Sequence, residues 1–171
     1  MRTWLLQSIL IGALAAAPSA EVIDRIMAVV TGQPITLSEV NAVLLFRFVE
    51  PPPGTRDPLA YAMDRLIERS LVLTEVDRFQ PPEPAPIEIN LRVQEIEQRA
   101  GSADAFEKGL AVTGTSRDQL RRRIRDDLRI STYLNQRFGA NRDPAERETA
   151  LDAWIAEIRR RADVIVQYQA R

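Results

Sequence analysis

The sequence predicts one mainly α-helical domain with a small β-sheet. Apolar residues recur at helical spacing in several segments, and most of these segments open with Ser, Thr or Asp, the residues that cap helix N-termini. β-Branched residues instead gather near the two ends of the chain. The length of 171 residues suits a single core. We expect about six helices and a small sheet formed by an N-terminal hairpin and a C-terminal strand.

Residues 1–20 read MRTWLLQSILIGALAAAPSA, the pattern of a secretory signal peptide. Arg2 supplies the positive start, an apolar stretch follows, and small residues precede a cleavage site that we place near Ala20. An uncleaved membrane anchor is the alternative, but the apolar stretch is short against the ~20 residues of a spanning helix. We therefore expect an exported protein in which residues 21–171 form one domain, with no stable membrane insertion after cleavage.

The first part of that domain predicts a hairpin followed by a helix. We expect a strand at 22–30, a turn over Thr31-Gly32-Gln33-Pro34 and a short strand at 33–36. Thr36 and Glu39 form a capping-box pattern that starts a helix from 37 to about 49. The segment Pro51-Pro52-Pro53-Gly54 ends it.

Three further helices are expected in the middle of the chain. Asp57 and Pro58 give an N-cap and a first-turn proline for a long helix at 58–79. A stiff proline-rich linker at 81–86 precedes a helix at 87–100. Ser102 then caps a short helix that carries Phe106 and Leu110.

The last part of the chain closes the domain. Thr115 or Ser116 caps a helix at 117–138, which Gly139 ends. Asp143 and Pro144 repeat the cap-plus-proline pattern before a helix at 145–161, and a strand follows at 164–168. Two N-terminal strands need a partner, so we expect this strand to pair with them. The segment 145–168 would then tie the two ends together.

Composition excludes several classes of chemistry. The chain has no Cys and no His, which removes disulfides, Cys nucleophiles, Ser-His-Asp triads and most zinc sites. We expect no enzyme activity, no cofactor and no metal. The 23 basic residues are balanced by 24 acidic ones, so no positive field favours nucleic acid. The arginine-rich stretch 117–129 is interpreted as a solvated helix face with i,i+4 ion pairs (Asp118–Arg122, Arg122–Asp126 and Arg123–Asp127), rather than as an anion-binding patch.

Four stretches resemble the N-terminal domain of the SurA-like periplasmic chaperone family: VIDRIMAVVTGQPITLSEV (22–40), LIERSLVLTEVDR (66–78), GLAVTGTSRDQLRRRIRDDLRISTYLNQRF (109–138) and WIAEIRRRADVIV (154–166). In well-known members, parvulin-type peptidyl-prolyl isomerase domains precede the closing helix. Here only residues 139–143 lie at that junction. The resemblance therefore implies a periplasmic chaperone core without isomerase chemistry.

A chaperone of this kind needs apolar surface that an unfolded polypeptide can reach. The run Ala42–Val49 is apolar nearly all round on a helix, a pattern typical of burial or of a partner surface. Leu45, Phe46 and Phe48 are the first candidates for client contact, and wrapping of this helix in the core is the alternative. The long second helix adds three secondary candidates, for which plain core packing is also open: Met63, Leu66 and Val72.

Three functions remain open at this point. The first is an exported holdase that binds unfolded outer-membrane or secreted polypeptides through an apolar groove. The second is a structural or assembly protein that docks one specific partner or a second copy of itself. The third is a peptidyl-prolyl isomerase with an unfamiliar site. The sequence indicates no particular oligomeric state.

Overall fold

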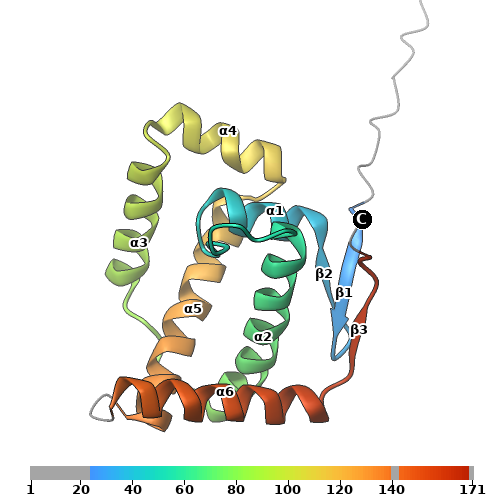
Figure 1. The fold of residues 1–171 in the computed structure, drawn as a ribbon. Helices are drawn as coiled ribbons and strands as arrows, with labels where there is room; N and C mark the ends of the chain where they lie inside the picture. Colours follow the sequence, from blue (N-terminus) through green and yellow to red (C-terminus); the bar gives the residue numbers. More distant parts are fainter. Residues whose placement is uncertain (1–23, 140–142, 170–171) are drawn as a thin grey trace, which may run out of the picture.

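The computed structural model describes residues 24–139 and 143–169, and its fold is mainly α-helical (Figure 1). The predicted six helices and small sheet are confirmed. The helices are α1 (Leu37–Leu45), α2 (Pro58–Phe79), α3 (Pro86–Arg99), α4 (Ala103–Thr113), α5 (Arg117–Phe138) and α6 (Pro144–Arg161), and the strands are β1 (Ile26–Val30), β2 (Gln33–Thr36) and β3 (Val164–Val166).

The long helices α2 and α5 stand side by side and form the centre of the molecule (Figure 1). Helix α6 crosses their lower ends in this view. Helix α3 lies beside α5, α4 packs against α1 at the top of this view, and the sheet lies on the other side against α2. The sequence is thus organised around the two longest amphipathic helices, with shorter elements covering their sides.

The sheet joins the two ends of the described chain, as predicted. Its order is β2–β1–β3, and both pairs are antiparallel. Ala28 lies opposite Val166 and Val30 opposite Val164. The expected strand at 164–168 is shorter because the backbone N–H groups of Gln167 and Tyr168 both donate to the Met27 carbonyl. Residues 22 and 23 of the expected first strand, and the expected signal peptide at 1–20, lie outside the described residues.

The predicted N-caps are formed. The side chains of Thr36, Asp57, Ser102 and Asp143 each accept a backbone N–H from the first turn of the following helix. Ser116, rather than Thr115, caps α5. At α1 the Thr36 side chain accepts the Glu39 N–H, and the Glu39 carboxylate lies between the Thr36 backbone and Arg123 of α5.

Two clusters of buried side chains make the core. The larger lies between the sheet, α1 and α2 and receives Tyr133 from α5 and Ile158 from α6. The smaller lies between α1, α3, α4 and α5, around the fully buried ring of Phe106. In the parts of the chain that the structure describes, no helix is both long and apolar enough to cross a bilayer.

Candidate functional site

Helix α1 ends four residues before the expected position, and this early end creates the candidate site. Arg47 adopts a left-handed backbone conformation with φ of 55°, which an α-helix cannot continue through. The Phe48 N–H then donates to the Val43 carbonyl over 2.9 Å, and the Val49 N–H donates to the same carbonyl. The chain therefore folds back on α1 and places Phe48 over the space between the long helices.

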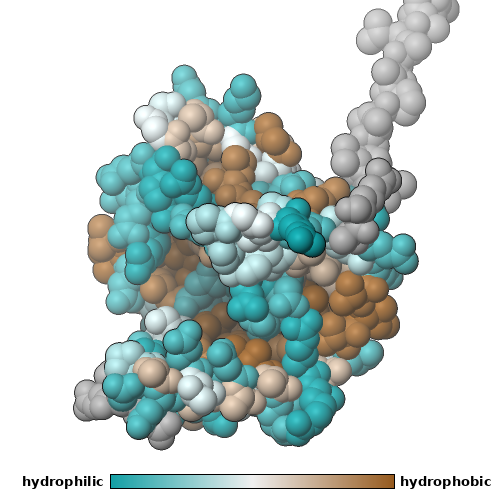
Figure 2. Space-filling view, in the orientation of Figure 1, coloured by the Kyte–Doolittle hydropathy of each residue, from teal (hydrophilic) through white to brown (hydrophobic). Residues whose placement is uncertain are grey.

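Three hollows meet at Phe48, which lines all of them. We call one of them, of about 450 Å³, the central recess. It lies between the loop after α1 and helices α2, α5 and α6. Figure 2 shows hydrophobic surface inside a depression above α6, with hydrophilic surface around it.

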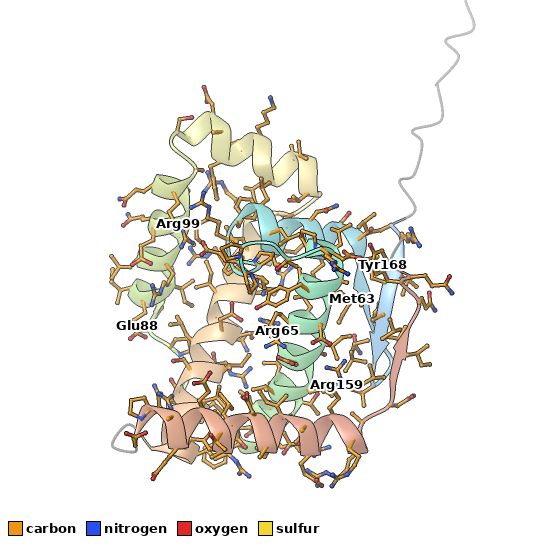
Figure 3. All side chains as sticks on the ribbon, in the orientation of Figure 1. Met63, Arg65, Glu88, Arg99, Arg159 and Tyr168 are labelled. Carbon is orange, nitrogen blue, oxygen red and sulfur yellow. The ribbon has the colours of Figure 1, made fainter. Side chains whose placement is uncertain are left out.

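The central recess combines an apolar interior with a charged edge. Its apolar side chains come from four different segments: Phe48, Val49, Tyr61, Val72, Ile130 and Ile155. Arg65 and Glu68 of α2 also line it and form an ion pair 2.7 Å long. Arg159 of α6 bonds Asp64 of α2 over 2.7 Å and so holds α6 against α2 near this edge (Figure 3). Apolar groups enclosed by a polar rim are typical of surfaces that take a partner.

The candidates from the first helix lie in three different environments. Leu45 is 51% exposed, Phe48 is half-buried at the hollows, and Phe46 is only 5% exposed. The Phe46 ring packs against Phe106 with ring centroids 5.8 Å apart. Phe46 therefore belongs to the core, as the alternative interpretation held, and an outside polypeptide does not reach it in this structure.

The secondary candidates on α2 are also buried. Met63, Leu66 and Val72 all belong to the larger core cluster. Of the three, Val72 alone lines the central recess. Plain core packing, the alternative left open for these residues, describes Met63 and Leu66.

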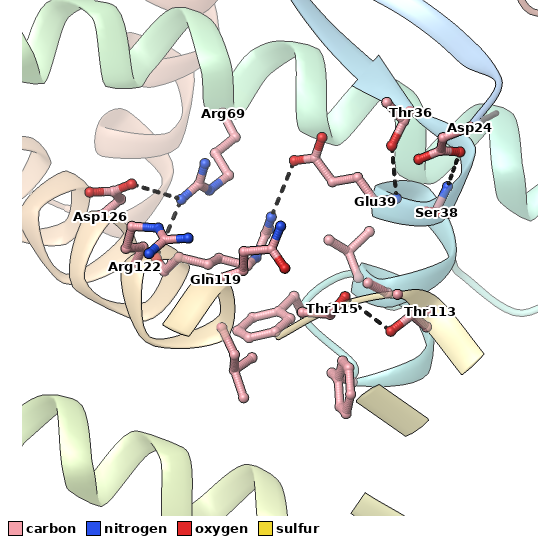
Figure 4. Close-up of a pocket in the computed structure, with 17 residues that line it drawn as sticks. Asp24, Thr36, Ser38, Glu39, Arg69, Thr113, Thr115, Gln119, Arg122 and Asp126 are labelled. Atoms are coloured by element: carbon pink, nitrogen blue, oxygen red, sulfur yellow. Dashed lines mark hydrogen bonds and ion pairs between the residues drawn. The ribbon is translucent and has the colours of Figure 1, made fainter. Parts of the chain in front are cut away.

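A second, more polar hollow of about 420 Å³ adjoins the recess through Phe48, Arg69 and Arg123. In Figure 4, Glu39 lies on its α1 side, with Gln119 and Arg122 on its α5 side. Arg123 lies 3.9 Å from Glu39 Oε1 and 3.7 Å from Asp127 Oδ2. Arg69 donates to Asp127 over 2.6 Å. Partly buried charges of both signs therefore meet where α1, α2 and α5 converge.

Burial shifts the protonation equilibria of these groups. Loss of hydration lowers the pKa of Arg123 to about 10, and repulsion from Arg69 adds to the effect. Loss of hydration also raises the pKa of Glu39 and that of Asp126, although neighbouring arginines oppose the shift. At neutral pH Arg123 therefore stays charged. For Glu39 and Asp126, the attraction of the neighbouring arginines offsets only part of the free energy lost with hydration.

The interpretation of 117–129 as a solvated face is wrong for two of its arginines. The side chains of Arg123 and Arg129 are only 15% and 8% exposed. Arg129 reaches back to Asp77 of α2 over 2.9 Å. Among the expected i,i+4 pairs, Arg123–Asp127 forms, and the ion pairs of the described residues include neither Asp118–Arg122 nor Arg122–Asp126. These arginines join helices to one another, which spacing along one helix could not reveal.

Sequence reasoning missed most of the residues that surround Phe48. Val49, Ile130 and Ile155 face the recess, yet in the sequence they look like any other apolar helix or loop residue. For the charged contacts between helices, a usable signal was the number of arginines in the fifth helix. The acidic residues of that helix are too few to pair with all of them. Within 24–139 and 143–169 no group of three or more Asp or Glu side chains is placed to hold a metal ion.

Comparison with known proteins adds no relative: no family model matches the chain, and no curated protein matches it.

Proposed function

We propose that this protein is an exported, periplasmic holdase-type chaperone that binds unfolded outer-membrane or secreted polypeptides and has no isomerase chemistry. The central recess carries the proposal. An apolar interior about Phe48 is open to solvent, and charged side chains border it. The resemblance of four stretches to the SurA-like chaperone family supports the same function.

The energetics of the recess suit a weak and general binder. Apolar contact stabilises a complex by ~25 cal/mol per Å² of surface removed from water, whatever the order of the side chains that provide it. The interior mixes aromatic and branched aliphatic groups. Such a surface accepts many apolar segments without requiring one sequence, as a holdase must.

Light scattering of a diluted, unfolded outer-membrane protein tests the proposal. The wild-type protein should suppress aggregation at several-fold molar excess, and Phe48→Ala should suppress it less. Leu91→Ala is the matched control, because Leu91 is an exposed apolar residue of α3 outside the hollows described here. Aggregation that continues unchanged with the wild-type protein would refute the proposal.

Two further measurements separate the other functions. Capture of one stoichiometric partner from a periplasmic extract, with no weakly bound clients, would favour an assembly protein. Acceleration of proline-limited refolding at catalytic concentration would favour an isomerase. Many weak clients and no acceleration are expected.

A further inference from the structure

Arg123 occupies the wall between the central recess and the polar hollow and lines both of them. Its guanidinium lies over the Phe48 ring, 4.7 Å from the ring centroid. The N–H groups of a guanidinium lie in its plane, so a ring against one face leaves the donating edges free to point elsewhere. Arg123 thus combines a cation with the apolar side chain at which the hollows meet.

The hydrogen-bonding capacity of Arg123 is not satisfied within the described residues. Its Nε is buried and has no hydrogen-bond partner. Its two carboxylate neighbours lie at 3.7 and 3.9 Å, beyond hydrogen-bond distance. Asp127 is already held by Arg69 over 2.6 Å. The outer guanidinium N–H groups also have no acceptor within hydrogen-bond distance among the described residues, and unlike Nε they are not sealed from solvent, so an incoming oxygen atom can bond them.

The surrounding charges favour a neutral oxygen over an anion. The polar hollow is lined by three arginines (Arg69, Arg122 and Arg123) and by three acids (Asp24, Glu39 and Asp126). These charges balance, so an added carboxylate finds no net positive field. A peptide carbonyl accepts the same hydrogen bond without adding a charge. Glu39, beside Arg123, offers an acceptor for a peptide N–H.

We propose that Arg123 and Glu39 form a backbone clamp for a bound, extended polypeptide, in which Arg123 donates to a peptide carbonyl and Glu39 accepts from a neighbouring peptide N–H. The clamp rests on the proposed function and deepens it. Every residue of a polypeptide except proline presents both groups, so the clamp adds affinity without reading side chains. Phe48 supplies the apolar contact beside it.

Fluorescence anisotropy with a labelled ten-residue apolar peptide, acetylated and amidated so that it carries no charge, tests the clamp. Arg123→Met removes the donors and keeps the length of the side chain, and it should weaken binding about tenfold, equivalent to ~1.4 kcal/mol. Arg122→Met is the matched control. It makes the same change at the adjacent, exposed residue of the same hollow and should change affinity less than about twofold.

Two Glu39 variants test the acceptor. Glu39→Gln keeps an oxygen that accepts a hydrogen bond and should retain wild-type affinity. Glu39→Met lacks it and should bind the capped peptide about threefold more weakly.

The peptide with a free carboxylate should bind as the capped one does. A loss of affinity in Arg123→Met that is confined to the free acid would show carboxylate recognition and overturn the clamp. Equal losses in the Arg122 and Arg123 variants would show a general cationic field and overturn it too.

Folding is checked by circular dichroism. Asp127 keeps Arg69 as its partner, and the half-exposed Glu39 can hydrate, so Arg123→Met should fold. If it does not, Arg123→Lys keeps the charge but has one donating nitrogen in place of the planar guanidinium, and should lose part of the same affinity. If the wild-type protein binds the peptide and the folded Arg123 variant binds it equally well, the clamp is refuted and the proposed function is not. Absence of wild-type binding refutes the proposed function and the clamp with it.

Discussion

Replacing Phe46 and Phe48 by alanine, one at a time, should separate folding from binding. Phe46 is 5% exposed and packs on Phe106, whereas Phe48 is half-buried where the hollows meet. Truncating a fully buried Phe costs about 3–5 kcal/mol of unfolding free energy. Phe48 buries less of its ring and also loses a contact with the Arg123 guanidinium worth ~0.5–1 kcal/mol. We expect a loss of about 4 kcal/mol for Phe46→Ala and about 2 kcal/mol for Phe48→Ala.

Urea unfolding followed by far-UV circular dichroism measures both values. Peptide affinity should change in the opposite order: Phe48→Ala should bind more weakly, and Phe46→Ala, measured where it is still folded, should bind like the wild type. A Phe48→Ala variant that loses as much stability as Phe46→Ala, yet binds peptide normally, would refute the division of the two rings between core and site.

Three other substitutions test separate parts of the structure. A Cβ at Gly109 would lie 3.3 Å from Leu45 Cδ2, so Gly109→Ala should not give the stabilisation of ~1 kcal/mol that is usual within a helix. If thermal unfolding shows the full stabilisation, α1 and α4 do not pack closely at this residue. Burial raises the pKa of Glu39, so its ionised form opposes folding. Glu39→Gln should therefore be at least as stable as wild type at pH 7, and the difference in unfolding free energy should shrink as the pH falls to 4.5 and below. A difference that grows in acid would contradict a raised pKa for Glu39. Arg129→Met should cost less than about 2 kcal/mol, because its exposed partner Asp77 can hydrate; a loss of 3–5 kcal/mol would mean that the charge left behind stays buried.

The helix starts could be predicted because each depends on a few neighbouring residues. Thr36, Asp57, Ser102 and Asp143 each satisfy a first-turn N–H two or three residues away. The pairing of β3 with the hairpin could also be predicted, because a two-stranded hairpin is marginally stable alone and a single other segment had β-type composition.

The end of α1 and the contents of the site could not be predicted in this way. Arg47 has no local reason for a positive φ; its conformation follows from Phe46 turning inward to Phe106 and from Phe48 folding back to Val43. Likewise, nothing in the spacing of 117–129 says that Arg123 meets Glu39 or that Arg129 meets Asp77. Each of these contacts joins distant segments, so they appear only once the helices are packed.

The pairing of β1 with β3 has a consequence for how the polypeptide matures. Synthesis delivers β1 before the helices α1 to α6 and β3 after them, so the sheet stays incomplete until α6 has been made. An unfinished chain would leave one edge of β1 unpaired and its backbone groups open to aggregation. Nascent chains stalled before Val164 should therefore be cut readily by protease, and chains released after Val166 should resist it. Early resistance would mean that the remaining elements close the fold without this last pairing.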